Sequence, residues 1–194
     1  MLKNRLLEAG LDQHLWHTQF GFREGCSTED AIFIARRHIE LALAQRNGCT
    51  NLLALDWQKA FDSISMDGML DALRSLGVPV PVRCMIGNIM RQRQFLVREC
   101  GCNSKLHPQM AGISQGCTLS PLIFIAVMTV VLKDAVDKLS PEAATAYRAG
   151  QLADLVYADD TLLISSSGQD LLKSEQERSR SAEPSSIVSR IRLA

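Results

Sequence analysis

Two adjacent aspartates, Asp159 and Asp160, are the residues of this chain best suited to chemistry. They lie between two apolar runs, residues 152–157 and 161–165, which predict a hairpin with the acids at its tip. Neighbouring carboxylates repel each other, and a divalent cation relieves that repulsion, because Mg²⁺ prefers oxygen ligands. A solvated turn is the commonest explanation of an isolated pair of aspartates, so the pair needs support from elsewhere in the chain.

A third carboxylate, Asp56, ends another short apolar run, residues 51–56, which predicts a buried strand. Strand ends and hairpin tips of one sheet can meet at the same edge. Three carboxylates there could hold two cations about 4 Å apart, the arrangement used for in-line phosphoryl transfer. Taken by itself, Asp56 is explained better as a polar cap at the end of the strand.

Residues 112–121 form a loop before a long apolar segment. Gly112 and Gly116 allow the backbone to approach a ligand closely, and Gln115 carries both a donor and an acceptor. Ser120 and Pro121 suit the start of a helix. An ordinary flexible loop explains the glycines but not the whole string.

The elements that must position these residues follow from periodicity and from helix start and stop signals. Helices are predicted at residues 28–46, 67–76, 81–92 and 119–139, and a hairpin at residues 94–100 and 105–110. The last helix is nearly all apolar and should lie deep in the core. The predicted fold class is therefore α+β, with an antiparallel sheet that carries Asp56 and residues 157–160.

Composition narrows the class of protein. The chain has 194 residues, of which 46% are hydrophobic, enough to bury a core and to exclude a wholly disordered chain. Its 21 basic and 21 acidic residues give no overall attraction to nucleic acid. Six cysteines without a CxxC pair indicate reduced thiols in a soluble, intracellular protein, of nucleus or cytoplasm. The longest apolar run, residues 119–132, is shorter than the roughly 20 residues that span a membrane.

Three segments together resemble motifs A, B and C of reverse transcriptases, in the same order and at similar spacing. They are Leu55-Asp-Trp-Gln-Lys-Ala-Phe61-Asp-Ser, Gln115-Gly-Cys-Thr-Leu-Ser-Pro121 and Tyr157-Ala-Asp-Asp160. With the upstream string Gln19-Phe-Gly-Phe-Arg23-Glu-Gly-Cys-Ser-Thr28, the chain most resembles the non-LTR retrotransposon branch and its group II intron relatives. The resemblance implies a right-hand polymerase palm with partial fingers and no thumb in residues 1–165. Residues 166–194 are a Ser-rich tail that we expect to be disordered.

The resemblance implies an RNA-directed DNA polymerase that adds deoxynucleotides to a primer 3′-hydroxyl on an RNA template. Asp56 and Asp159 would be the principal metal ligands, and Asp160 would support them. The cofactor would be Mg²⁺, with Mn²⁺ as a substitute.

The resemblance also implies a nucleotide pocket. The backbone at Trp57 would face the triphosphate, and Phe61 would lie under the incoming sugar and exclude a 2′-hydroxyl. Gln115 and Gly116 would line the pocket and contact the template, while Tyr157 would lie near the primer terminus.

Basic residues outnumber acids by five to one between Arg83 and Lys105. Such a stretch can meet phosphates even in a neutral chain, although a solvated surface explains it equally well. The candidate nucleic-acid contacts are Arg23, Arg91, Arg93, Arg98 and Lys105.

The upstream fingers motif and the downstream thumb of the family have no counterpart in this sequence, and we expect a longer product to supply them. The alternative is a catalytically inactive, truncated remnant with at most weak nucleic-acid binding. A Mg²⁺-dependent phosphodiesterase is less favoured, because it leaves the loop at residues 112–121 without a role.

Overall fold

The computed structural model describes residues 2–46, 48–114, 116–166, 176 and 192–193. Its helices are α1 (Leu2–Glu8), α2 (Leu11–His14), α3 (Thr28–Leu43), α4 (Ala60–Ser63), α5 (Met66–Ser75), α6 (Val80–Arg91), α7 (Ser120–Asp137) and α8 (Pro141–Arg148). Its strands are β1 (Asn51–Leu55), β2 (Trp57–Gln58), β3 (Gln94–Phe95), β4 (Arg98–Glu99), β5 (Cys102–Asn103), β6 (His107–Pro108), β7 (Leu152–Tyr157), β8 (Asp160–Ser165) and β9 (Arg192–Leu193).

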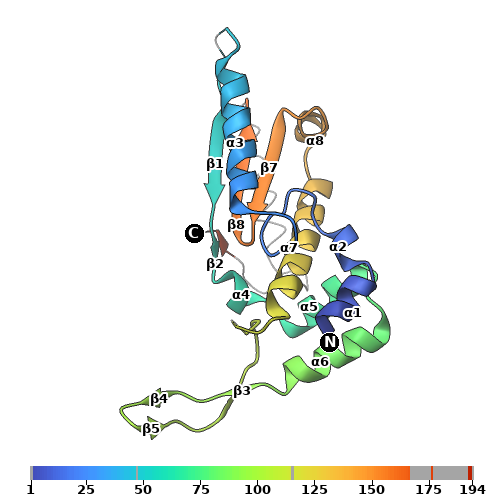
Figure 1. Cartoon of the computed structure of the whole chain (residues 1–194), viewed down its shortest axis with the longest axis vertical. Helices are drawn as coiled ribbons and strands as arrows, with labels where there is room; N and C mark the ends of the chain where they lie inside the picture. Colours follow the sequence, from blue (N-terminus) through green and yellow to red (C-terminus); the bar gives the residue numbers. More distant parts are fainter. Residues whose placement is uncertain (1, 47, 115, 167–175, 177–191, 194) are drawn as a thin grey trace.

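A three-stranded antiparallel sheet in the order β1-β8-β7 organises the fold. Helix α3 runs along one face of the sheet, while α7 and α8 lie on the other side (Figure 1). Strands β7 and β8 form the predicted hairpin, and their pairing ends at Tyr157 opposite Asp160. The expected α+β architecture is confirmed.

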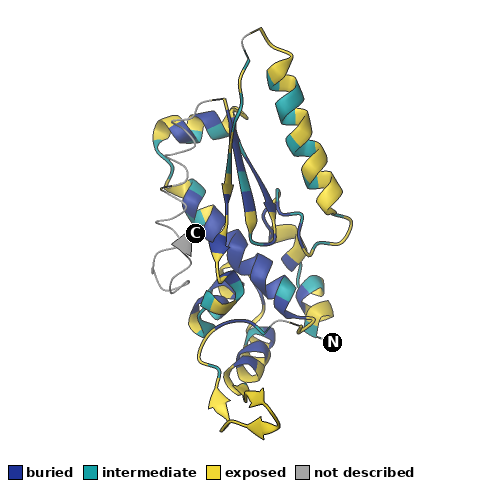
Figure 2. Cartoon of the chain, turned by 90° about the vertical axis from the view of Figure 1, so that its left-hand side faces the viewer, coloured by how far each residue is buried: buried dark blue, intermediate teal, exposed yellow. Residues whose placement is uncertain are grey.

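Helix α7 is the centre of the core, as its apolar sequence predicts. Ser120 and Pro121 occupy its first turn, and almost every residue from there to Leu132 is buried. The helix crosses the middle of the molecule and packs against α5 (Figure 2). A helix that is apolar on all sides has to be surrounded by protein, and that is its environment here.

Helix α3 begins where the sequence predicts. The Ser27 side chain accepts a hydrogen bond from the Asp30 backbone N–H, and the Asp30 carboxylate accepts one from the Ser27 backbone N–H. This reciprocal capping box fixes the start of the helix. The helix ends at Leu43, three residues before the predicted end.

Residues 51–55 form the predicted strand, β1, but the prediction that this strand is buried is wrong. Strand β1 is at the edge of the sheet, and its residues alternate between exposed and more buried positions. Leu52 is 46% exposed, whereas Leu55 is buried. A strand made only of apolar residues is fully buried only if other elements cover both faces of the sheet. Here the face of β1 on the side of α3 is covered incompletely.

The predicted hairpin around residues 101–104 is present and projects from the body of the protein (Figure 1). Two short pairings, β3 with β6 and β4 with β5, hold it together. All four of these strands are exposed. The hairpin therefore adds little to the core and presents its side chains to the surroundings.

Most of the predicted tail, residues 166–194, lies outside the described residues, apart from Ser166, Gln176 and β9. Strand β9 pairs with β2, placing Leu193 opposite Trp57. Within the part of the chain that the structure describes, none of the helices combines the length and the apolar character needed to cross a membrane.

Candidate active site

The three predicted carboxylates come together at one end of the sheet. Leu55, the last residue of β1, pairs with Thr161 of β8, so the next residue, Asp56, lies one step further along, on the side of Asp160. Asp159 occupies the two-residue turn between β7 and β8. The negative charges of Asp56 and Asp160 both act on Asp159, which places the three carboxylates in the same electrostatic environment.

The electrostatics of this end of the sheet reflect the crowding of acids. Asp159 is half-buried, whereas Asp56 and Asp160 are exposed. Desolvation raises the pKa of Asp159, and the negative charges of Asp160 and Asp56 raise it further, against an opposing backbone hydrogen bond. A bound cation would offset the repulsion between the negative charges of these carboxylates.

The side chains at this end of the sheet offer only oxygen donors. Among the described residues, no three or more His, Cys, Asp or Glu side chains are placed so that together they could hold a metal ion. Mg²⁺ usually takes only one or two protein carboxylates and completes its shell with water and substrate phosphates. Exposed carboxylates at a strand end and a hairpin tip fit this mode of binding.

The two aromatic candidates after Asp56 differ in environment. Trp57 is buried, and its Nε1 donates a hydrogen bond of 3.1 Å to Thr161 Oγ1, so its side chain is held within the core. Phe61 is half-buried, and its ring stacks on that of Phe124 with centroids 4.0 Å apart and planes 9° apart. This stacking holds the Phe61 ring in a fixed orientation.

The loop before α7 is attached to the segment that follows Asp56. The Gly112 N–H donates to Ile64 O, and the Ile113 N–H donates to Phe61 O, each at 2.8 Å. A Cβ on Gly112 would lie 3.0 Å from the Cα of Asp62, a tight contact with backbone, and the φ of +85° at Gly112 also favours glycine. Gly116 is exposed with a φ of +85°.

Gln115, predicted to line the nucleotide pocket, lies outside the described residues. Tyr157 is 37% exposed and lies at the end of β7. With Asp160 it lines a groove of about 310 Å³ between α3 and the sheet.

The five basic candidates do not form one surface. Arg93 faces inward, where its guanidinium donates to Ser114 Oγ and to the carbonyls of Gly112 and Met90. Burial lowers the pKa of Arg93. The sequence reveals its charge, but only the fold shows that this charge holds the loop before α7.

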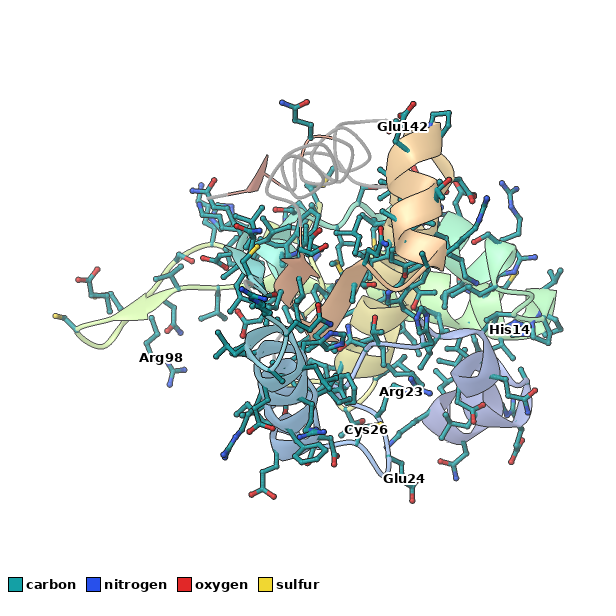
Figure 3. All side chains as sticks on the ribbon, turned by 90° about the horizontal axis from the view of Figure 1, so that it is seen from above. His14, Arg23, Glu24, Cys26, Arg98 and Glu142 are labelled. Atoms are coloured by element: carbon teal, nitrogen blue, oxygen red, sulfur yellow. The ribbon has the colours of Figure 1, made fainter. Side chains whose placement is uncertain are left out.

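The other four candidates lie in three different places, and Arg23 shares a pocket with Thr118 and Pro121 of the loop before α7. Arg23 donates to the backbone carbonyls of Trp16 and Gln19, and Arg91 forms an exposed ion pair with Asp67. Arg98 and Lys105 belong to the projecting hairpin, and Figure 3 shows Arg98 well away from Arg23. The basic side chains of the projecting hairpin are therefore separate from those of the rest of the protein.

Sequence reasoning noted the string that begins at Gln19 but not that residues 18–21 support the Asp159–Asp160 turn. Residues 18–21 lie beside β7, where Phe20 N–H donates to Val156 O and Val156 N–H donates to Thr18 O. Gln19 in this segment is buried. Its residue type and neighbours gave no local signal for this contact.

Comparison with known proteins gives a family and relatives. Residues 1–184 match the family described as reverse transcriptase (RNA-dependent DNA polymerase). The chain is 33% identical over 151 residues to the probable RNA-directed DNA polymerase from transposon BS of Drosophila melanogaster, an alignment covering 77% of this chain and 16% of that protein. It is 32% identical over 117 residues to the retrovirus-related Pol polyprotein from type-1 retrotransposable element R2 of Nasonia vitripennis, covering 60% and 11%.

Solved structures share the fold. Telomerase from Candida tropicalis in complex with a TWJ fragment of telomeric RNA superposes with a TM-score of 0.67 at 13% identity, over 93% of this chain and 30% of that one. Apo telomerase from the same organism, truncated from its C-terminal domain, gives 0.61 at 14% identity, over 91% and 34%. The chain thus spans less than a fifth of the curated relatives named above and about a third of these structures.

Proposed function

Because the chain belongs to the reverse transcriptase (RNA-dependent DNA polymerase) family, we propose that it carries the catalytic centre of an RNA-directed DNA polymerase from a retrotransposon-type element. The observation that supports this most is the meeting of Asp56 with Asp159 and Asp160 at one end of the sheet. The reaction is transfer of a deoxynucleotide from its triphosphate to a primer 3′-hydroxyl, with release of pyrophosphate.

Asp56 and Asp159 would hold Mg²⁺, or Mn²⁺ in its place, and Asp160 would support them. When bound, the cations supply the positive charge that activates the primer hydroxyl and stabilises the leaving pyrophosphate. The task of the protein is to keep the three carboxylates oriented and ionised. Since burial and the neighbouring acids raise the pKa of Asp159, its ionisation and cation binding support each other.

The nucleotide pocket lies between the segment after Asp56 and the loop before α7. The backbone at Trp57 faces the triphosphate, and Phe61, held by its stacking on Phe124, lies under the sugar. Gln115 and Gly116 line the pocket from the loop. A rigid aromatic ring in that place would clash with a 2′-hydroxyl and thereby favour deoxynucleotides.

The proposed partners are an RNA template, a DNA primer and deoxynucleoside triphosphates. Tyr157, at the end of β7, lies near the primer terminus in this proposal. The projecting hairpin, with Arg98 and Lys105, contributes phosphate contacts. The full enzyme, of which this chain matches a minor part, supplies the further contacts that grip the primer and template.

Primer extension tests this function. The purified chain is incubated with an oligonucleotide primer on an RNA template, deoxynucleotides and Mg²⁺, beside Asp159→Ala and the exposed control Asp12→Ala. We expect extension by the wild type and by Asp12→Ala, and none by Asp159→Ala. A folded wild-type chain that extends nothing would instead support the inactive remnant.

The same assay without deoxynucleotides tests the phosphodiesterase. Cleavage of the nucleic acid that requires Mg²⁺ and Asp159 would favour that reaction over polymerisation.

A further inference from the structure

The carboxamide of Gln19 is buried against the turn that carries Asp159. Gln19 is 1% exposed. Its Oε1 accepts hydrogen bonds from the backbone N–H groups of Ala158 and Gly21, both at 2.8 Å. Its Nε2 donates to Ala158 O at 3.1 Å. One side chain therefore holds both backbone polar groups of a residue 139 positions away in sequence.

Ala158 is the residue of the turn that most needs such support. It is the first of the two residues between β7 and β8, with a φ of +57°, in the left-handed region. That region is unfavourable for a residue that carries a Cβ. Ala158 is also buried, so its N–H and C=O need partners within the protein. Gln19 provides partners for both groups in this conformation.

Gly21 brings the segment against the turn from the same side. A Cβ on Gly21 would lie 2.3 Å from the backbone N of Ala158, a distance at which atoms overlap. The segment is attached to β7 on either side of Gln19, through Thr18 O and Phe20 N–H. Gln19 is thus fixed at both flanks, and its side chain has little freedom to leave the turn.

We propose that Gln19 is a positioning residue, which sets the direction of the Asp159 and Asp160 carboxylates by holding the backbone of Ala158. It acts through the main chain and touches neither substrate nor cation. Removing a group that orients a metal ligand through hydrogen bonds typically lowers metal affinity or activity by about 10–100-fold. The catalytic consequence rests on the proposed polymerase function, whereas the effect on the turn does not.

Amide hydrogen exchange measures the effect on the turn. In Gln19→Met, which keeps the side-chain length and removes the hydrogen bonds, the amides of Ala158 and Gly21 should exchange roughly tenfold faster or more. The amides of Phe20 and Val156, which donate to backbone carbonyls, should keep their wild-type rates. Unchanged exchange at Ala158 would overturn the proposal.

Primer extension measures the catalytic consequence. Gln19→Met should extend about 10–100-fold more slowly at saturating deoxynucleotide. It should require more Mg²⁺ for half-maximal rate, and its KM for deoxynucleotide at saturating Mg²⁺ should stay close to the wild-type value. Gln13→Met, the same exchange at an exposed position of α2, should match the wild type.

A second control separates positioning from general stability. Leu73→Ala removes a buried side chain of α5, away from the turn, and is compared with Gln19→Met by melting temperature. If both variants lose extension in proportion to their melting temperatures, with the same Mg²⁺ requirement, Gln19 is only structural and the proposal fails. A wild-type chain that extends nothing would refute the proposed function, and the exchange rates would still decide whether Gln19 holds the turn.

Gln19→Glu keeps the proposal testable if Gln19→Met does not fold. The protonated carboxyl group can repeat all three hydrogen bonds, whereas the ionised group cannot donate to Ala158 O. Its extension rate relative to the wild type should therefore fall as the pH rises. A ratio that does not change with pH would contradict a role for the donated hydrogen bond.

Discussion

Replacing Asp154 with alanine should strongly lower the free energy of unfolding of the protein. Asp154 lies in the middle of β7 and is 1% exposed. Its carboxylate accepts hydrogen bonds from Trp16 Nε1 at 2.6 Å, Thr18 Oγ1 at 2.9 Å and Tyr147 OH at 2.9 Å. These partners come from the N-terminal segment and α8, so a single carboxylate ties both to the sheet.

Asp154→Ala leaves these donors without the carboxylate. A buried donor left unsatisfied costs about 1–3 kcal/mol, and Trp16 is buried while Thr18 and Tyr147 are half-buried. We therefore expect Asp154→Ala to lower the free energy of unfolding by about 3–5 kcal/mol. In Asp154→Asn the amide oxygen can still accept from Trp16 and Thr18, and the amide N–H can donate to Tyr147, so this variant should lose only about 1 kcal/mol.

Urea denaturation followed by far-UV circular dichroism tests this prediction. A loss of about 3–5 kcal/mol is a large part of the roughly 5–15 kcal/mol that stabilises a domain, so the midpoint should fall strongly while the slope stays unchanged. Asp12→Ala, at an exposed position, is the control and should leave the midpoint in place. If Asp154→Ala costs no more than Asp154→Asn, the carboxylate is not the tie that we describe.

Three further predictions concern the site. Gly21→Ala places a Cβ 2.3 Å from the Ala158 backbone N, so it should displace the Asp159 turn and reduce primer extension more than it reduces the melting temperature; equal losses would contradict this. Burial and nearby acids raise the pKa of Asp159, so ionisation of Asp159 destabilises the metal-free fold. This loss of stability is absent below the unfolded-state pKa of about 3.9, and it develops as the pH rises through the folded-state pKa. Asp159→Asn should therefore raise the melting temperature at neutral pH, measured with EDTA, and the gain should vanish at acid pH; a gain that persists there would be inconsistent with titration as its cause. Phe61→Val should admit ribonucleotides, seen as a smaller ratio of deoxynucleotide to ribonucleotide incorporation in primer extension, and an unchanged ratio would remove Phe61 from the sugar pocket.

Local rules account for much of the secondary structure. The capping residues Ser27 and Asp30 mark the start of α3, and the apolar run that opens with Ser120-Pro121 becomes the buried helix α7. The apolar segments around Ala158-Asp159 form the β7–β8 hairpin. These features depend on residues that are close together in the sequence, which is why the sequence predicts them. The burial of β1 could not, because it depends on which faces of the sheet other elements cover.

The sequence by itself determined the family and the three carboxylates. Asp56, Asp159 and Asp160 are recognisable because their residue types and flanking strings are specific. That they share one end of the sheet required the register of β1 with β8, which follows from the path of the whole chain.

Only the tertiary structure decided what supports these residues. Arg93, which the sequence offers as a nucleic-acid contact, holds the loop before α7. Gln19 and Asp154 carry no distinctive local pattern, yet one holds the Ala158 turn and the other ties two elements to β7. The physical reason is that a buried polar group is defined by its partners, and the partnerships of Gln19 with Ala158 and of Asp154 with Trp16 each join residues more than 100 positions apart along the chain.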